Sequence, residues 1–214
     1  MRSKTADQAD GPFVDLTFAI SGRSVPIDHG YALYAAVSRA VPQLHGASWL
    51  GLHPIDGASM PPALLLNRRS RLRLRLPLER INAGLQLAGK DLDIDGNPLV
   101  VGVPAVRALE PARNLAARLV VVKLTSFPLS GSARVDEEAA RKAVDAELRR
   151  QMAQLPVEGQ LHVRKLREVR VAGRRVLGFA VRVEGLDPED SVRLQSAGLG
   201  GKRRMGCGIF IPTR

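Results

Sequence analysis

SAGLGGKRRMGCGIFIP, residues 196–212, places five glycines and three consecutive cations ahead of a short apolar segment. The glycines are Gly198, Gly200, Gly201, Gly206 and Gly208. Glycine is retained where φ must be positive or where another group approaches the main chain closely. We therefore predict a loop that lies against a ligand, and Lys202, Arg203 and Arg204 indicate that this ligand is an anion. A helix over 188–197 is expected before the loop, and a strand over 208–211 after it.

The loop lacks the spacing of two common nucleotide-binding motifs. A P-loop requires glycine five residues before its Gly-Lys pair and Ser or Thr after it, but Ser196 and Arg203 occupy those positions. A dinucleotide fingerprint would require glycine at position 203. The spacing favours an extended polyanion over a single nucleotide.

The charge distribution indicates the same class of partner. The net charge is +11, and residues 160–214 carry 12 Lys and Arg against 5 Asp and Glu, which is +7 of that total. Such an excess favours nucleic acid first and an anionic membrane second. We expect His162 and Arg164, on a predicted strand of this basic part, to contact the nucleic acid.

The composition excludes several other classes. Cys207 is the only cysteine, so a disulfide framework is ruled out. No apolar run approaches the roughly 20 residues of a membrane span. We expect a cytoplasmic protein that binds no metal or other cofactor and no membrane, with a disordered N-terminus over residues 1–11.

The order of predicted elements repeats once along the chain. Both halves, 12–112 and 113–214, are expected to run strand, helix, two or more strands, helix, strand. This order predicts an α+β fold of two tandem ferredoxin-like (RRM-like) units. The helices are expected at 28–40, 78–87, 136–155 and 188–197, and the strands at 13–20, 48–53, 63–67, 71–77, 91–94, 99–109, 118–125, 160–171, 174–183 and 208–211.

The segment RLRLRLP, residues 71–77, alternates strictly between leucine and arginine. Alternation places the leucines on the core face of a strand and Arg71, Arg73 and Arg75 on the other face. Ordinary solvation of these arginines is favoured over contact with RNA.

Few residues suit catalysis on a polyanion. The sequence has no carboxylate pair within a motif and no histidine cluster with metal-ligand spacing. RNA carries its own nucleophile, the 2′-hydroxyl, so one base and one acid suffice to cleave it. Histidine fits either role because imidazole titrates near neutral pH.

Three histidines of the first half are candidates. His29 stands at the start of the first predicted helix, where a capping or packing role against Tyr31 and Tyr34 is favoured. His45 follows that helix in a turn, and His53 precedes a proline at a strand end, where a structural role is more common.

The sequence resembles the CRISPR-associated endoribonucleases of the RAMP superfamily that cut repeat RNA into guide RNAs, most closely the MYXAN-subtype branch. GLGGKRRMGCGIFIP resembles the C-terminal glycine-rich signature of the superfamily, and VPIDHGYALYAAVSRAVPQLH, residues 25–45, resembles the first strand-to-helix segment. The family typically places a catalytic histidine just beyond the first helix, which corresponds to His45. Ser38 stands where some members have a tyrosine, so the second group is left open between Tyr34, His29 and a C-terminal arginine.

The resemblance implies metal-independent cleavage of the CRISPR repeat, as a hairpin or a single strand, in the precursor transcript. The products would carry a 2′,3′-cyclic phosphate and a 5′-hydroxyl. RAMP proteins with the same loop also serve as non-catalytic RNA-binding subunits of CRISPR effector complexes, which is the alternative function. A generic basic RNA-binding protein is a third possibility.

Overall fold

The computed structural model describes residues 11–123 and 136–213. The predicted disordered N-terminus, residues 1–11, lies outside the described residues except for Gly11. The last two residues of the strand expected at 118–125 also lie outside them. The chain divides into two compact units, residues 1–108 and 109–214. The two predicted units have their boundary four residues later.

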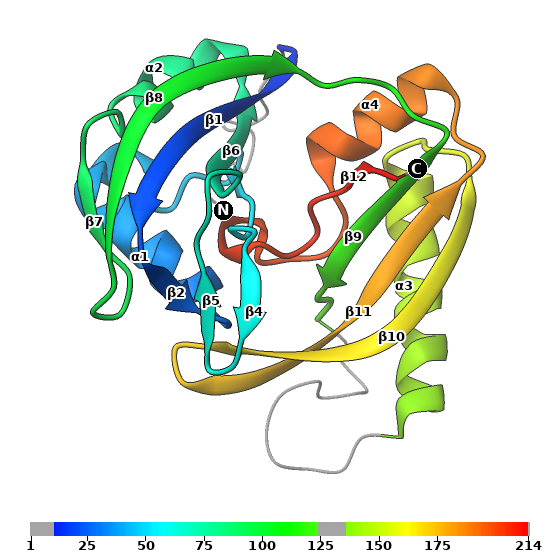
Figure 1. Cartoon of the computed structure of the whole chain (residues 1–214). Helices are drawn as coiled ribbons and strands as arrows, with labels where there is room; N and C mark the ends of the chain where they lie inside the picture. The colour runs from blue at the N-terminus through cyan, green and yellow to red at the C-terminus, as the bar shows by residue number, and fades with distance from the viewer. Residues whose placement is uncertain (1–10, 124–135, 214) are drawn as a thin grey trace, which may run out of the picture. The chain divides into compact units, whose positions relative to one another are not determined.

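Unit 1 is built on a five-stranded antiparallel sheet (Figure 1). Its order is β3-β6-β1-β8-β7, with β1 (Phe13–Gly22) at the centre. The other strands are β3 (Gly51–Leu52), β6 (Arg71–Pro77), β7 (Asp91–Asp93) and β8 (Pro98–Ala108). Helix α1 (Gly30–Ala40) connects β1 to the strands that precede β6, and α2 (Ile81–Leu85) follows β6. This connectivity with the order β3-β6-β1-β8 is ferredoxin-like.

Two short 3₁₀ turns and a second sheet complete unit 1. The turns η1 (Pro42–Leu44) and η2 (Leu78–Arg80) follow α1 and precede α2. The second sheet joins β2 (Ser24–Pro26), β5 (Ala63–Leu65) and β4 (Ala58–Met60). Only β5 of this sheet was predicted: it lies in the apolar run 63–66, whereas β2 and β4 have three residues each and too little alternation to be recognised.

The alternating segment forms β6 with the predicted bounds. Leu72, Leu74 and Leu76 are fully buried, as expected. The prediction that Arg75 is solvated is wrong, since its side chain is 1% exposed. Arg71 and Arg73 are half-buried. Alternation identifies the face of a strand but says nothing about what covers that face.

Unit 2 repeats the ferredoxin-like arrangement. Its sheet has the order β10-β11-β9-β12, and every pair in it is antiparallel. The strands are β9 (Asn114–Val120), β10 (Gln160–Val171), β11 (Arg174–Glu184) and β12 (Ile211–Pro212). The helices are α3 (Glu137–Gln154) and α4 (Pro188–Ala197). The predicted tandem ferredoxin-like fold is confirmed.

The helices of unit 2 begin where aspartates cap them. The side chain of Asp136 accepts from the amides of Glu138 and Ala139, and that of Asp187 accepts from the amide of Asp190. Such caps satisfy amides that the helix itself leaves without acceptors. In unit 1, α1 begins at Gly30, two residues later than the helix expected from residue 28, and His29 precedes it.

The hairpin of β10 and β11 is longer than the sheet that carries it. β11 pairs with β9 from Phe179 to Glu184, whereas its pairing with β10 continues to the turn at Ala172–Gly173. In Figure 1 the hairpin extends well past the end of β9. The turn residues have φ of +50° and +75°, the left-handed values that two-residue hairpin turns require.

Candidate active site and nucleic-acid interface

His45 is an exposed side chain at a fixed position of unit 1. It follows η1, whose Leu44 is fully buried, and its amide donates to Pro42 O at 3.0 Å. Its imidazole stacks on the ring of Tyr34, with 6.2 Å between ring centroids and 13° between planes. The Tyr34 hydroxyl accepts from the amide of Gly46 at 2.9 Å, so α1 holds the turn that carries the imidazole.

A pocket of about 260 Å³ opens beside this pair of rings. The structure therefore brings together two of the three predicted catalytic residues, His45 and Tyr34, at the edge of one pocket. The lining residues are Tyr31, Tyr34, Ala35, Ser38, Arg39 and His45. An exposed imidazole over a pocket can reach a bound phosphodiester.

His29 has a different environment from His45. It is buried, its Nε2 accepts from the amide of Ile55 at 2.9 Å, and its Nδ1 lies 2.9 Å from Pro26 O. Both ring nitrogens therefore contact the main chain, which suits a neutral imidazole that joins the start of α1 to the end of β2 and to the segment after β3. The geometry favours the packing role over proton transfer to RNA.

His53 belongs to a buried group of charges on the sheet. Arg75 donates from Nε and NH2 to the two oxygens of Asp15 at 2.8 and 2.9 Å, and His53 Nε2 lies 3.5 Å from the same carboxylate. Burial alone would raise the pKa of Asp15, but the nearby imidazole of His53 and the hydrogen-bonded guanidinium of Arg75 outweigh it and hold that pKa well below its usual range. Burial lowers the pKa of His53. These residues belong to the sheet of unit 1 and do not line the pocket beside His45.

The glycine loop, residues 198–208, is shaped by contacts with its own chain. Gly198, Gly200 and Gly208 have φ between +65° and +74°. A Cβ at any of them would lie within 2.5 Å of a backbone carbonyl oxygen, that of Gly208, Val121 or Leu199. The prediction that these glycines signal a ligand overlooked this requirement, because close approach of the chain to itself imposes the same residue type.

Most amides of the glycine loop donate within unit 2. Gly201 donates to Val121 O at 2.7 Å and Gly208 to Leu119 O at 2.8 Å, so both ends of the loop are fixed to the end of β9. Gly200 donates to the side chain of Gln151 on α3 at 2.8 Å. Gly206, also at positive φ, closes the turn η3 (Arg203–Met205). The loop is a rigid platform for the cations that it carries.

The three cations of the loop are held differently. Lys202 is exposed and adopts a left-handed conformation, with φ of +62°, which is uncommon for a residue other than glycine. Arg203 donates to Ser196 O, in the last turn of α4, at 2.7 Å. Arg204 is half-buried. Lys202 is therefore presented to solvent, while Arg203 also ties the loop to α4.

A second concentration of cations lies beside the glycine loop. Residues 164–175 of the hairpin, here called the basic arm, contain six Lys and Arg and one acid, Glu168. The cations are Arg164, Lys165, Arg167, Arg170, Arg174 and Arg175. Val169, Val171 and Val176 of the hairpin pack in one small apolar cluster with Cys207 of the loop, which brings the arm and the loop together.

His162 is not part of that cluster. Its side chain is 40% exposed and lies 3.8 Å from Glu184. His162 pairs with Arg182 of β11, and Arg182 pairs with Ala116 near the start of β9. His162 therefore lies on the side of the sheet where β9 starts, whereas the glycine loop contacts the end of β9. Arg164, two residues later, is exposed at a register shift between Val163 and Leu166 that begins the arm.

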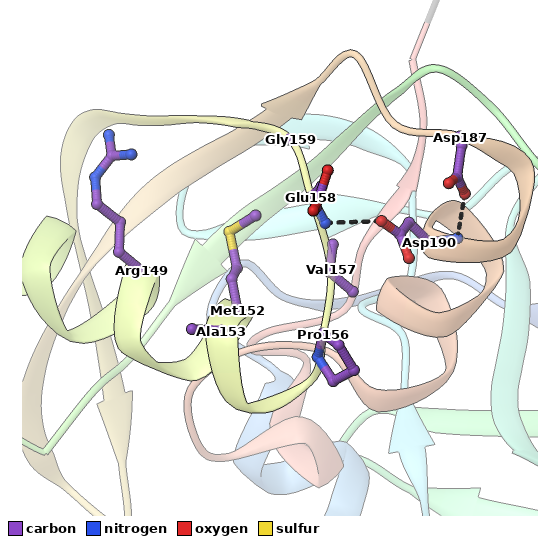
Figure 2. A pocket seen from close by; sticks show the side chains of 9 residues that line it. All are labelled: Arg149, Met152, Ala153, Pro156, Val157, Glu158, Gly159, Asp187 and Asp190. Atoms are coloured by element: carbon purple, nitrogen blue, oxygen red, sulfur yellow. Dashed lines mark hydrogen bonds between the residues drawn. The ribbon is translucent and has the colours of Figure 1, made fainter.

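A larger pocket, of about 840 Å³, lies between α3 and the start of α4 (Figure 2). Its carboxylates serve the fold: Asp190 accepts from the amide of Glu158 at 2.7 Å and binds Arg193, and Asp187 caps α4. Figure 2 shows both hydrogen bonds between the drawn residues. Acidic walls disfavour a polyanion, so we do not assign RNA to this pocket.

Residues 11–123 and 136–213 contain neither a candidate metal cluster nor a candidate membrane helix. No group of three or more His, Cys, Asp or Glu side chains there has the geometry of a metal site. No helix in this part of the chain is long and apolar enough to cross a membrane.

Two features of the site were missed by sequence reasoning. Gln151 supports the glycine loop, but a glutamine on the polar side of a helix has no recognisable signal. The basic arm was predicted only as two strands of a hairpin. Its extension past β9 was detectable in principle, because the strands predicted at 160–171 and 174–183 are longer than their neighbours.

The chain was compared with protein families, curated proteins and solved structures. A family model described as Cas6 CRISPR matches residues 14–214. The CRISPR-associated endonuclease Cas6 of Myxococcus xanthus (strain DK1622) is 41% identical over 200 residues, covering 94% of this chain and 81% of that protein.

Solved structures agree with the fold. A CRISPR-associated protein Cas6 superimposes with a TM-score of 0.65 at 11% identity, covering 95% of this chain and 99% of that one. A Thermus thermophilus Cse3 bound to an RNA that represents a pre-cleavage complex gives a TM-score of 0.52 at 15% identity, covering 94% and 98%. The family match and the identity to the Myxococcus protein establish that the chain belongs to the Cas6 family.

Proposed function

We propose that this protein is a metal-independent endoribonuclease that cleaves CRISPR repeat RNA in the precursor transcript. The relative from Myxococcus xanthus, 41% identical to this chain, is named an endonuclease. This chain carries an exposed imidazole in a defined setting. The observation that carries the proposal is the position of His45: exposed, stacked on Tyr34 and open to a pocket.

His45 is proposed as the acid–base group of the reaction. The 2′-oxygen attacks the adjacent phosphorus and loses its proton, the bond from phosphorus to the 5′-oxygen breaks, and that oxygen gains a proton. The products are a 2′,3′-cyclic phosphate and a 5′-hydroxyl, and no electrons are exchanged with a cofactor. An imidazole can accept the first proton or donate the second.

Tyr34 is proposed to position His45. Its ring supports one side of the imidazole, and its hydroxyl already accepts a hydrogen bond from the amide after His45. Of the two candidates for the second group in unit 1, Tyr34 and His29, Tyr34 stacks on His45. His29 is assigned to the fold, since its ring nitrogens contact the main chain.

Unit 2 is proposed to supply affinity for the RNA. Lys202, Arg203 and Arg204 on the rigid glycine loop and the six cations of the basic arm provide positive charge beside one another. RNA is bound largely through phosphates, 2′-hydroxyls and unpaired bases. The glycines Gly198, Gly200, Gly201, Gly206 and Gly208 contribute by fixing the loop, and His162 and Arg164 extend the surface along β10.

The test is cleavage of a repeat RNA from a CRISPR array near the gene, with EDTA present. We expect the wild-type protein to cut the RNA at one bond and the His45→Ala variant to leave it intact while binding it within a few-fold of wild type. The His162→Ala variant is the matched control, and it should weaken binding but still cut. An RNA that binds to wild type and stays intact over hours would instead support a non-catalytic RNA-binding subunit.

A further inference from the structure

The pocket beside His45 is formed by one face of α1. Tyr31, Ala35 and Ser38 follow one another at spacings of four and three residues, which places their side chains on the same side of a helix. Tyr34 and Arg39 stand at the borders of this face. Because alanine and serine are small, the larger side chains around them leave a hollow of about 260 Å³. Pockets for drug-sized ligands occupy roughly 300–1,000 Å³, so this hollow suits a smaller group.

The lining of the pocket suits a flat ring rather than a phosphate. Tyr31 is 41% exposed, which is high for an aromatic side chain, and offers a ring for stacking. The guanidinium of Arg39, the one cation among the lining residues, donates to Asp93 O at 3.1 Å and is thereby oriented. A guanidinium both stacks on nucleobases and donates to their edges.

Ser38 adds a polar group at the base of the pocket. It is 8% exposed, and its hydroxyl has no hydrogen-bond partner among residues 11–123 and 136–213. Serine within a helix commonly bonds to the carbonyl four residues earlier, and a buried hydroxyl without a partner is destabilising. Rotation about a single bond turns this hydroxyl toward the pocket, where the edge of a base offers both donors and acceptors.

We propose that this pocket holds one unpaired nucleobase of the RNA, next to the cleaved bond, stacked on Tyr31 and contacted at its edge by Ser38 and Arg39. The assignment of the base to the cleaved bond rests on the proposed function, because His45 forms part of the same pocket. The pocket makes cleavage selective for the base at one position.

The first experiment detects the base without cleavage. Repeat RNAs carrying 2-aminopurine at one unpaired position at a time are bound to the His45→Ala protein, and fluorescence is recorded, since stacking quenches this base. We expect strong quenching at one position. The quenching should persist when Tyr31→Phe is added and be lost with Tyr31→Ala, which removes an exposed ring.

The second experiment measures selectivity with an otherwise active protein. Single-turnover rates are compared for RNAs with each of the four bases, or an abasic sugar, at that position. We expect wild type to prefer one base by at least tenfold over the abasic RNA. Ala35→Met, which fills the pocket, should cut all five RNAs at the abasic rate, while Ala40→Met, outside the pocket on the same helix, should behave as wild type.

The outcomes separate the two proposals. If no position shows quenching that depends on the Tyr31 ring, or if Ala35→Met keeps the base preference, the nucleobase pocket is refuted although the nuclease proposal stands. If wild type binds the repeat but does not cut it, the nuclease proposal fails, and the quenching experiment still decides whether a base occupies the pocket.

Discussion

Replacing Arg75 by methionine should destabilise unit 1 by about 3 kcal/mol. Removing one partner of a buried ion pair costs roughly 3–5 kcal/mol, because the other charge is left buried without compensation. Arg75 is 1% exposed and forms two hydrogen bonds to Asp15, whose side chain is 14% exposed. The lower end of the range applies because Asp15 keeps some contact with water and keeps His53 at 3.5 Å.

The assay is urea-induced unfolding at pH 7, followed by tryptophan fluorescence. Trp49 is the only tryptophan and lies in unit 1, so its signal reports on that unit even when the two units unfold separately. Arg73→Met is the matched control: Arg73 lies on the same face of β6 and is half-buried, and its loss should change the free energy of unfolding by less than about 1 kcal/mol.

A double variant makes the reasoning stricter. Replacing both Asp15 and Arg75, as Asp15→Leu with Arg75→Met, removes both charges, so it should restore most of the stability that the single variant loses. The reasoning is refuted if Arg75→Met costs less than about 1 kcal/mol, or if the double variant is no more stable than Arg75→Met alone.

Three further predictions concern pH, the glycine loop and the basic arm. Because the pKa of His53 is lowered in the folded protein, the unfolded state binds more protons than the folded state once the pH falls below about 6.5. The free energy of unfolding should therefore decline from pH 7 to pH 5, and the His53→Gln variant should show a shallower decline in the same fluorescence assay. An equal slope in both proteins would contradict this. Gln151→Met removes the acceptor of the Gly200 amide, so the variant should bind repeat RNA several-fold more weakly, as measured by fluorescence anisotropy. Unchanged affinity would show that the glycine loop needs no support from α3. Replacing Arg167, Arg170 and Arg174 by alanine should reduce the slope of log K against log salt by about 2, since each phosphate contact contributes roughly 0.7–0.9; an unchanged slope would remove the arm from the interface.

Much of the fold was predictable because local patterns agreed with it. The strict alternation of 71–77 gave the bounds of β6, and Pro188 with the glycine loop after Ala197 gave those of α4. β9 begins at Asn114, four residues before the predicted strand, because asparagine and the two alanines that follow Leu115 are depleted in strands and conceal its start. β12 is shorter than predicted because residues 208–210 belong to the glycine loop and the segment after it.

The candidate site was less accessible from the sequence. The resemblance to a known family singled out His45, but its stacking on Tyr34 depends on how α1 and the following turn meet. Four of the five glycines of residues 198–208 have the positive φ that was expected, and Gly201 does not. The cause was misread, since three of these glycines avoid clashes with carbonyl groups of unit 2. Burial of Arg75 was not predictable, because its partner Asp15 is 60 residues away in the chain.

The most direct test of the proposed chemistry removes one hydroxyl group from the RNA. A repeat RNA with a single 2′-deoxyribose on the 5′ side of the cleaved phosphate lacks the internal nucleophile and keeps every phosphate and base. Wild-type protein should bind this RNA with unchanged affinity and fail to cut it, whereas the all-ribose RNA should yield a 5′ fragment that ends in a 2′,3′-cyclic phosphate. Cleavage of the deoxy-substituted RNA at the same bond would contradict attack by the 2′-hydroxyl and the role assigned to His45.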